Sequence, residues 1–281
     1  MGDFPRTEVG GVSLSRMIVG TNWILGYSHT SAAKSRWIRS YQTRENVADI
    51  LTVFFEAGVD AVMGMPEPIL INGIQDAQER TGVEAKLILT PHFNVLPNGD
   101  PDMEPERVFD TCKEYGATFC FPHQGVTDRL MDRLHGVIRD LDTYTDMIRE
   151  REMVPGLSTH APETITIADS SGADIETYIQ IYNSTGFLMQ VETDWVMRLI
   201  QKAKKPVMTI KPLAAGQLLP PVGLAYVWNT IRDQDMVTIG TTVPDEAREV
   251  IDLSLSYLER RLPDHELQTS RSKATLAAGV A

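Results

Sequence analysis

The stretch ENVADILTVFFEAGVDAVMG, residues 45–64, contains one complete helix-to-strand unit and decides the fold class. Its first part, residues 45–58, has apolar residues at helical spacing and ends at a glycine, which commonly closes a helix. Its last part, residues 60–64, is a short apolar run with the length and composition of a buried strand. A helix that leads directly into a buried strand is typical of α/β proteins with a parallel sheet.

The same unit recurs along the whole chain. Eight short apolar runs predict strands at residues 16–20, 60–64, 86–90, 117–121, 153–158, 177–182, 207–210 and 236–240. Helix patterns lie between them, for example at residues 105–116, 194–205 and 243–259. Eight parallel strands with intervening helices are best closed as a (β/α)8 TIM barrel, whose active site lies at the C-terminal ends of the strands. Residues 7–15, TEVGGVSLS, predict an N-terminal hairpin that caps the barrel floor.

Length and charge narrow the class of protein. A chain of 281 residues fits one large domain, so we expect a single barrel over residues 1–281, with a loose tail after about residue 262. The net charge of -12 leaves no basic surplus for binding nucleic acid or an anionic membrane. The N-terminus lacks an apolar signal core, and no apolar stretch reaches membrane-spanning length. We expect a cytoplasmic protein that binds a small molecule.

Several segments resemble the aldo-keto reductase superfamily. The predicted floor hairpin followed by SRMIVGTNW, residues 15–23, is similar to the family's opening. The segment IKPLAAGQL, residues 210–218, resembles its seventh strand and loop, and MVTIGTTVPDEAREVIDLS, residues 236–254, resembles its eighth strand and helix. The family uses these two loops to hold the pyrophosphate and adenosine of a nicotinamide cofactor. The resemblance therefore implies an aldo-keto reductase-like barrel.

The resemblance does not extend to the family's catalytic tetrad. The family has an aspartate ending the second strand, a tyrosine about one turn later, a lysine ending the third strand and a histidine ending the fourth. In this chain the four positions fall on Met63, near Pro68, on Pro91 or His92, and on His123. Only the last of them, His123, matches the family's residue. Without the tyrosine, ordinary carbonyl reduction lacks its general acid.

The cofactor loops also differ from the family pattern. Glu246 and Val250 stand where the family commonly has a basic residue and an asparagine. An acidic residue at this place would repel a 2′-phosphate. We therefore expect NADPH to bind weakly or not at all.

Three histidines follow successive predicted strands in the same phase. They are His92 in LTPHF, His123 in CFPHQG and His160 in LSTHAP, separated by 31 (123 minus 92) and 37 (160 minus 123) residues. Each lies two residues beyond the last core-type residue of its strand, so the three side chains share an inward or outward phase. Neutral imidazole is a common ligand of zinc and similar transition metals, and three such ligands leave a coordination position open. We predict a divalent-metal site. The alternative for each residue is a histidine that only hydrogen-bonds within its loop, which is more common for a lone strand-end histidine. His123 has a second alternative, because it can be inherited from a reductase ancestor without a metal role.

Other polar residues at predicted strand ends complete a candidate site. Glu67 and Glu192 are candidates to transfer a proton to or from the substrate. The alternative for Glu67 is a solvated acid in a loop. The alternative for Glu192 is a charge partner of the N-terminus of the following helix. Lys211 is a candidate to stabilise negative charge that develops on the substrate. The alternative is that Lys211 is a cofactor-loop residue inherited from the family. Asn183 is a candidate to hydrogen-bond a substrate hydroxyl.

The loop after the first strand, residues 21–45, is the longest on this face. It combines aromatic and basic residues that we predict to bind substrate, namely Trp23, Tyr27, Arg36 and Arg39. The alternative use of the loop is a contact in a homo-oligomer, because Trp and Arg are also enriched at interfaces. His29, His135 and His265 lack a comparable context and are not part of the predicted site.

These observations predict a metal-dependent enzyme, a lyase, isomerase or hydrolase, that acts on a small polyhydroxy or carbonyl compound. Two alternatives remain open. One is an NAD(P)H-dependent aldo-keto reductase with displaced acid-base groups, and the other is a non-catalytic barrel that binds a ligand.

Overall fold

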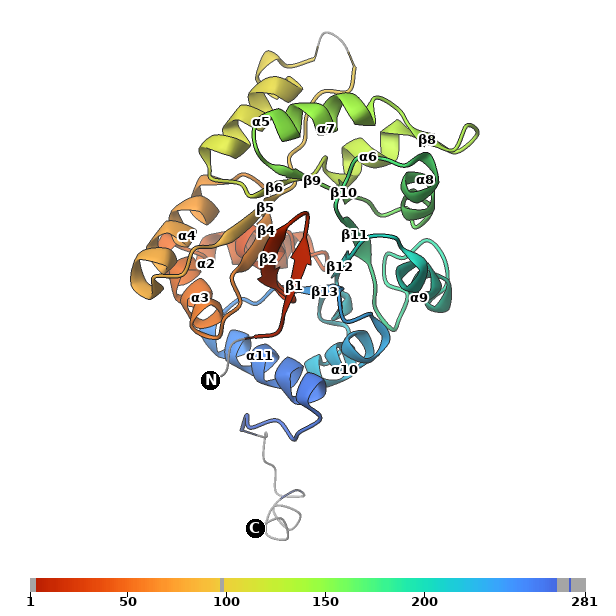
Figure 1. The fold of residues 1–281 in the computed structure, drawn as a ribbon. Coiled ribbons are helices and arrows are strands. Elements are labelled where there is room, and N and C mark those ends of the chain that lie inside the picture. Colours follow the sequence, from red (N-terminus) through yellow and green to blue (C-terminus); the bar gives the residue numbers. More distant parts are fainter. Residues whose placement is uncertain (1–3, 97–98, 267–272, 274–281) are drawn as a thin grey trace.

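The computed structural model describes residues 4–96, 99–266 and 273, which form a ring of parallel strands surrounded by helices (Figure 1). All eight predicted strand runs contain strands, so the predicted (β/α)8 barrel is confirmed. The barrel strands are β3 (Met17–Gly20), β4 (Ala61–Gly64), β5 (Lys86–Leu89), β6 (Phe119–Cys120), β9 (Val154–Pro155), β10 (Leu157–Ser158), β11 (Tyr178–Ile181), β12 (Val207–Ile210) and β13 (Met236–Ile239).

The barrel closes through its fifth strand, which is interrupted at one residue. The sheet order is β10-β11-β12-β13-β3-β4-β5-β6-β9, so β9 and β10 are its two ends. These two pieces are consecutive in the chain and are separated only by Gly156. A Cβ atom added at Gly156 would lie 2.5 Å from Cε1 of Phe121. The glycine therefore lets a large core side chain pack directly against the strand that completes the ring.

Eight helices follow the strands and cover the outside of the barrel. They are α3 (Arg44–Glu56), α4 (Pro68–Thr81), α5 (Pro105–Glu114), α7 (Leu141–Glu150), α8 (Glu163–Ser171), α9 (Thr193–Lys202), α10 (Pro220–Thr230) and α11 (Pro244–Glu259). Helix α3 begins after Thr43, whose side chain accepts a hydrogen bond from the backbone N–H of Asn46. Its apolar side, including the fully buried Leu51 and Phe54, packs into the core between helices and strands.

Shorter elements lie in the connecting loops. They are α1 (Asn22–Leu25), α2 (Ala32–Tyr41), η1 (Pro101–Met103), α6 (Gln124–Leu130), the antiparallel pair β7 (Met131–Asp132) and β8 (Val137–Ile138), and η2 (Ala214–Gly216).

The predicted hairpin is present and caps the barrel floor. It consists of β1 (Arg6–Val9) and β2 (Val12–Ser15), drawn in front of the barrel in Figure 1. Gly10 and Gly11 both have positive φ values, +55° and +79°, which a two-residue hairpin turn of this kind requires. Val9 and Leu14 belong to the same buried cluster as Ile18 of β3, so the hairpin fills the floor of the barrel.

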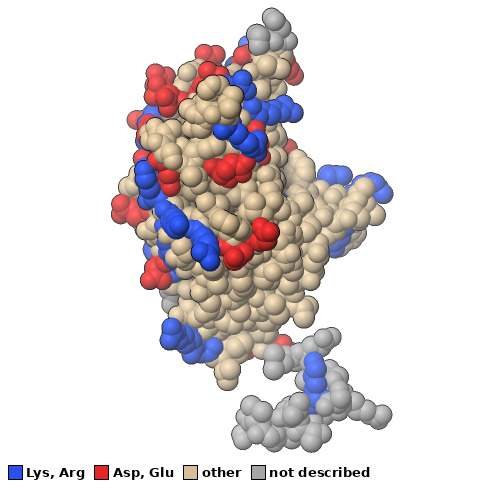
Figure 2. Space-filling model, turned by 90° about the vertical axis from the view of Figure 1, so that its right-hand side faces the viewer, with Lys and Arg blue, Asp and Glu red and all other residues tan. Residues whose placement is uncertain are grey.

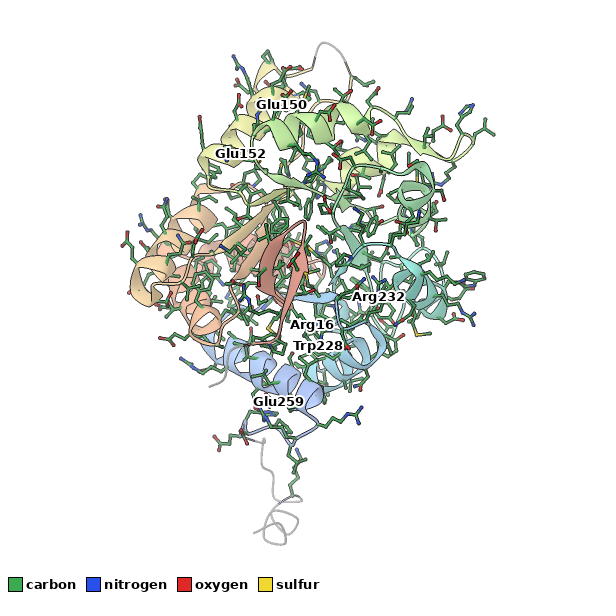
Figure 3. The ribbon with its side chains drawn as sticks, viewed as in Figure 1. Arg16, Glu150, Glu152, Trp228, Arg232 and Glu259 are labelled. Atoms are coloured by element: carbon green, nitrogen blue, oxygen red, sulfur yellow. The ribbon has the colours of Figure 1, made fainter. Side chains whose placement is uncertain are left out.

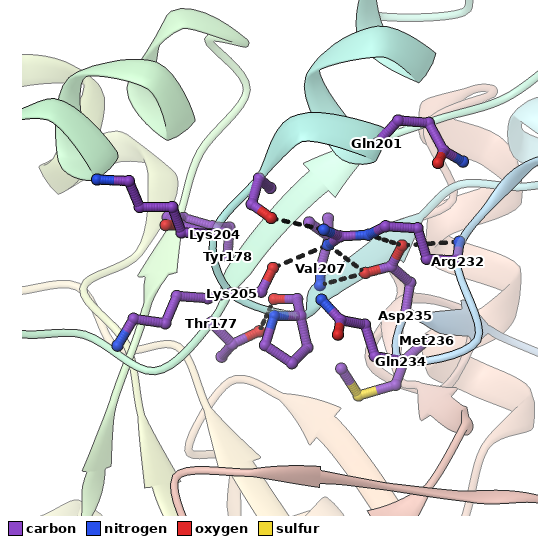
Figure 4. Close-up of polar contacts among 12 residues, drawn as sticks. Thr177, Tyr178, Gln201, Lys204, Lys205, Val207, Arg232, Gln234, Asp235 and Met236 are labelled. Carbon is purple, nitrogen blue, oxygen red and sulfur yellow. Dashed lines mark hydrogen bonds and ion pairs between the residues drawn. The ribbon is translucent and has the colours of Figure 1, made fainter.

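A polar network ties the starts of three barrel strands together at the floor. The fully buried Asp235 accepts hydrogen bonds from the backbone N–H of Val207 and from the guanidinium of Arg232 (Figure 4). Arg16 donates to the carbonyls of Asp235 and Arg232 and lies 5.4 Å from the ring centroid of Trp228, and Figure 3 shows these side chains close together. The network fixes the register of β12 and β13 beside β3.

The segment after α11 is tied to the barrel as far as the described residues extend. Arg261 forms an ion pair with Asp252, and the backbone N–H groups of Asp264 and His265 donate to the same carboxylate. Residues up to His265 are therefore hydrogen-bonded to α11, and the loose tail after about residue 262 stays a prediction. The rest of the predicted tail lies outside the described residues, apart from residue 273.

Charges of both signs are interspersed on the face shown in Figure 2. Many are paired, as where Arg149 contacts the carboxylates of Asp174 and Glu176. Within the described residues, no helix combines the length and the apolar character needed to cross a membrane.

Candidate active site

A cavity of about 700 Å³ lies at the C-terminal ends of the barrel strands. Met63 of β4, Ile179 of β11 and Ile210 of β12 contribute apolar surface from inside the barrel. The remaining lining comes largely from the loops that follow β3, β12 and β13. A cavity of this size at this end of a barrel is the usual place for a small-molecule site.

The three predicted histidines all line this cavity. His92 follows β5, His123 follows β6 and His160 follows β10. The rings of His92 and His123 pack together, with centroids 3.8 Å apart and planes tilted by 45°. His92 and His123 lie three residues beyond the ends of β5 and β6 (92 minus 89, 123 minus 120), and His160 lies two beyond the end of β10 (160 minus 158). Their positions just past the strand ends bring the three imidazoles to one cavity.

A backbone hydrogen bond at the start of α6 fixes the tautomer of the neutral His123 ring. Its Nδ1 accepts a hydrogen bond from the backbone N–H of Gly125 at 3.0 Å. A nitrogen that accepts carries no proton, so in the neutral ring the proton is on Nε2. Burial lowers the pKa of His123 to about 4, helped by the neighbouring His92, His160 and Lys211. Near neutral pH, His123 is therefore a neutral imidazole whose Nε2–H is a hydrogen-bond donor.

The other two imidazoles are also neutral near pH 7. Burial lowers the pKa of His160 to about 4, with Lys211 and His29 as further causes. Burial likewise lowers the pKa of His92, and Arg129 adds to the effect. The cavity wall formed by these rings is polar but uncharged.

This arrangement does not support the predicted metal centre. A metal binds an unprotonated ring nitrogen, whereas Nδ1 of His123 is occupied by the Gly125 N–H and Nε2 carries the proton. His92 packs against the His123 ring. Across residues 4–96, 99–266 and 273, no group of three or more His, Cys, Asp or Glu is placed to hold a metal ion. The prediction of His92, His123 and His160 as zinc-type ligands therefore has no support among the described residues and stays a prediction.

Lys211 lies directly after β12 and pairs with a histidine from the loop that follows β3. Its Nζ is 3.3 Å from Nε2 of His29, and Nδ1 of His29 is 2.8 Å from the carbonyl oxygen of Tyr27. A carbonyl only accepts, so the proton of His29 is on Nδ1, and Nε2 accepts from Lys211. Burial lowers the pKa of Lys211 to about 8. The lysine is therefore mostly an ammonium at neutral pH, and it loses its proton much more easily than an exposed lysine.

The loop that carries Lys211 has a strained backbone. Lys211, Ala214 and Ala215 have φ values of +61°, +49° and +55°, in the left-handed region that non-glycine residues rarely adopt. Each such residue costs on the order of 1–3 kcal/mol and persists where the surrounding structure enforces it, often at ligand sites. Since this loop lines the cavity, the strain lies at the candidate site.

Three predicted site residues have other roles. Glu67 is the capping residue before α4 and lies outside the cavity lining. Glu192 is exposed before α9, which is the alternative helix-partner position predicted for it. Asn183 is buried, and its amide binds the backbone of Phe187 in its own loop. The proton-transfer role of the two glutamates and the substrate contact of Asn183 stay predictions that these positions do not support.

The long loop after β3 contributes only part of its predicted binding set. Trp23 and Tyr27 line the cavity. Arg39 instead donates to the carbonyl of Gly26, a residue with a φ of +84°, and so stabilises the turn between α1 and α2. Arg36 is exposed on α2, outside the cavity lining. Substrate binding by Arg36 and Arg39 stays a prediction, and neither residue lines the cavity.

A half-exposed aromatic and cationic cluster lies on α2. The rings of Trp37 and Tyr41 stack with centroids 5.2 Å apart, and Nζ of Lys34 is 3.9 Å from the Trp37 centroid. The contact in a homo-oligomer that we consider for this loop stays a prediction.

The side of the cavity near α11 combines unpaired hydroxyls with carboxylates. Among the described residues, the buried hydroxyls of Thr238 and Thr241 have no hydrogen-bond partner, and both residues line the cavity. Glu246 accepts the backbone N–H of Thr242 at 2.7 Å, and Glu249 lies in the same lining. This end suits a ligand with hydroxyl groups, because buried polar groups require partners and carboxylates accept from hydroxyls.

Sequence reasoning missed His29, Thr238 and Thr241. His29 and its partner Lys211 are separated by 182 positions in the chain, so no local pattern links them. The available signal was indirect, since His29 lies two residues after Tyr27 in the loop predicted to bind substrate. The two threonines lie in residues 236–254, the segment that resembles a cofactor loop, but nothing in that segment distinguished them from their neighbours.

Comparisons with known proteins give similarity in structure alone. No protein-family model matches the chain. No curated protein matches it in sequence.

Solved structures of low sequence identity match almost the whole chain. A Pseudomonas aeruginosa protein described as an aldo-keto reductase has a TM-score of 0.64 and 14% identity, over 91% of this chain and 98% of that one. A Brucella melitensis aldo/keto reductase has a TM-score of 0.58 and 13% identity, over 96% and 95%. A glycerol dehydrogenase from Gluconobacter oxydans has a TM-score of 0.57 and 12% identity, over 94% and 98%. The chain therefore has an aldo-keto reductase-like fold, a (β/α)8 barrel with a hairpin at its floor.

Proposed function

We propose that the protein is a nicotinamide-dependent reductase of small carbonyl compounds in which Lys211 replaces the missing tyrosine as proton donor. The observation that carries the proposal is the Lys211 amine in a cavity that also presents the Nε2–H of a neutral His123. The fold is shared with proteins described as reductases and as a dehydrogenase. This reading is the alternative with displaced acid-base groups that the sequence left open.

Two residues would carry the acid-base chemistry. The Nε2–H of His123 donates to the carbonyl oxygen and polarises the C=O bond, which a neutral imidazole can do without giving up its proton. The Lys211 ammonium then donates a proton to the oxygen as negative charge develops on it. His29 accepts from the same ammonium and so orients Nζ within the cavity. A bound nicotinamide would supply the hydride.

The residues near α11 fit a dinucleotide that has no 2′-phosphate. The unpaired hydroxyls of Thr238 and Thr241 can bind polar groups of such a ligand, and Glu246 and Glu249 can accept from ribose hydroxyls. The same carboxylates would repel a 2′-phosphate.

We expect NADH to bind at least tenfold more tightly than NADPH, a difference of about 1.4 kcal/mol. Fluorescence titration of each nucleotide measures the two dissociation constants directly. Glu249→Gln removes one of the carboxylates that line the cavity and should narrow the difference. Equal or tighter binding of NADPH would contradict the role of the carboxylates, and the absence of binding by both nucleotides would end the reductase proposal.

Turnover provides the direct test of the proposed reaction. Oxidation of NADH should be followed at 340 nm with a panel of small aldehydes, ketones and ketoses. We expect NADH loss that depends on the carbonyl compound. If a protein that binds NADH reduces no member of the panel, the proposed reaction class is wrong.

The pH profile of kcat/KM should have a plateau between two limbs. Lys211 must be protonated to donate, so activity falls as the pH rises through about 8. His123 must be neutral to keep its tautomer, so activity also falls as the pH drops through about 4. In a variant that exposes Lys211 to water, the fall of kcat/KM on the alkaline side should move to higher pH. A kcat/KM that stays constant from pH 6 to pH 10 would exclude Lys211 as the proton donor.

A further inference from the structure

Lys211 is also placed to act as a nucleophile. We propose that the Lys211 amine forms a covalent iminium with small aldehydes and ketones, which makes the cavity a covalent carbonyl-binding site. This chemistry goes beyond the proposed reduction because it requires no nicotinamide. Both proposals involve the Lys211 side chain. They can be tested separately because imine formation is measured without any nucleotide.

The surroundings of Lys211 differ from those of several lysines in the described part of the chain. Lys113 and Lys205 form ion pairs with Glu152 and Glu176. The Nζ atom of Lys211 has a neutral histidine as its hydrogen-bond partner instead, and within the described residues no carboxylate forms an ion pair with it. An amine with a neutral acceptor as its partner gives up its proton more readily than an ion-paired one.

The position of Lys211 gives its amine access to a ligand. Lys211 lines the cavity beside apolar side chains, including Ile179, Ile210 and Leu213. Its backbone has a φ of +61° and is followed by Pro212, so the strand ends sharply at this residue. Lysines that are desolvated in apolar pockets are the ones that serve as nucleophiles toward carbonyl groups. In agreement with this environment, burial lowers the pKa of Lys211 to about 8, so that a substantial fraction is unprotonated in mildly basic solution.

The bond changes are those of ordinary imine formation. The Nζ lone pair attacks the carbonyl carbon, a C–N bond forms, and a proton moves from nitrogen to oxygen to give a carbinolamine. His29 accepts a hydrogen bond from Nζ and is placed to take that proton in transit. The C–O bond then breaks, the oxygen leaves as water after gaining a proton from solvent, and a C=N⁺ bond remains. No oxidant or reductant is consumed.

Reductive trapping tests the proposal without any nucleotide. The full-length protein is incubated with dihydroxyacetone, a small polyhydroxy ketone, and sodium cyanoborohydride, which reduces the iminium to a stable secondary amine. Intact-mass measurement should show one adduct, equal to the mass of the probe less one oxygen atom. Peptide mapping should place it on Lys211, and this readout uses the wild-type protein, so it does not depend on whether a variant folds.

The pH dependence and a matched control make the test specific. The initial labelling rate should fall at least tenfold from pH 8 to pH 6, because the unprotonated fraction of an amine with a pKa of about 8 decreases by more than that factor. Lys211→Met should abolish the adduct. Lys113→Met should retain it, since Lys113 is exposed, pairs with Glu152 and lies outside the cavity lining.

The outcomes separate this proposal from the proposed reductase. Labelling of Lys211 without turnover of NADH would support the covalent site and reject the reduction. Adducts spread over several surface lysines at similar rates, or no adduct on the wild-type protein, would overturn the covalent site. Turnover of NADH together with an unlabelled Lys211 would leave only the proton-donor role for this residue.

Discussion

Lys211→Met should lower kcat for carbonyl reduction by about 10²–10⁴-fold while leaving the barrel folded. A positioned proton donor typically contributes this much to the rate, and methionine fills the space of the lysine stem without an ionisable group. The substitution should not unfold the protein, because Lys211 follows the end of β12 at the face of the barrel that serves function more than stability. Steady-state kinetics with NADH measure the loss, and circular dichroism checks the fold.

The matched variant Lys211→Arg distinguishes proton donation from charge alone. Arginine keeps a positive charge at the site, but its pKa is above 12, so it does not release a proton near neutral pH. A proton-donor role predicts that Lys211→Arg is nearly as slow as Lys211→Met and lacks the alkaline limb near pH 8. Recovery of most of the activity in Lys211→Arg would show that the lysine acts only through its charge.

Asp235→Ala should destabilise the barrel by about 3–5 kcal/mol, the usual effect of removing one partner of a buried ion pair. The Asp235 side chain is fully buried and that of Arg232 is only 18% exposed, so the arginine would lose its counterion in a poorly solvated place. The N–H groups of Val207 and Arg232 would lose their acceptor as well. We expect the melting temperature to fall by roughly 10 °C, since each 1 kcal/mol shifts the midpoint of a protein of this size by about 2–4 °C.

An exposed acidic residue in the same turn supplies the control. Asp233 is two positions earlier and lies at the surface, so Asp233→Ala should change the stability by less than about 0.5 kcal/mol. Urea unfolding followed by circular dichroism compares the two variants with the wild type. If both variants lose the same small amount of stability, the floor network does not hold the strands in register.

The fold was predictable because its signals are local. Each strand and outer helix is encoded by a run of residues with its own periodicity, as in residues 45–64, which form nearly all of α3 and the whole of β4. The hairpin was visible from the glycine pair at residues 10 and 11. The break of the fifth strand at Gly156 was not visible, because it depends on the Phe121 ring from the neighbouring strand.

The sequence could place the imidazoles but not their hydrogen bonds. Because parallel barrel strands end at one face, the strand-end positions of His92, His123 and His160 bring them to one cavity. The proton position on neutral His123 depends on a single backbone hydrogen bond from Gly125 to Nδ1. The spacing of the histidines contains no information about that bond.

The sequence by itself determined the order of strands and helices, the hairpin and the strand-end positions of the imidazoles, because periodicity and turn residues act over a few positions. Only the tertiary structure decided which polar residues act together. It joined Lys211 to His29 although 182 positions separate them in the chain, turned the Asn183 amide into its own loop and left Glu192 exposed before a helix. These outcomes depend on burial and on contacts between residues far apart in the chain, and burial is also what lowers the pKa of Lys211 to about 8.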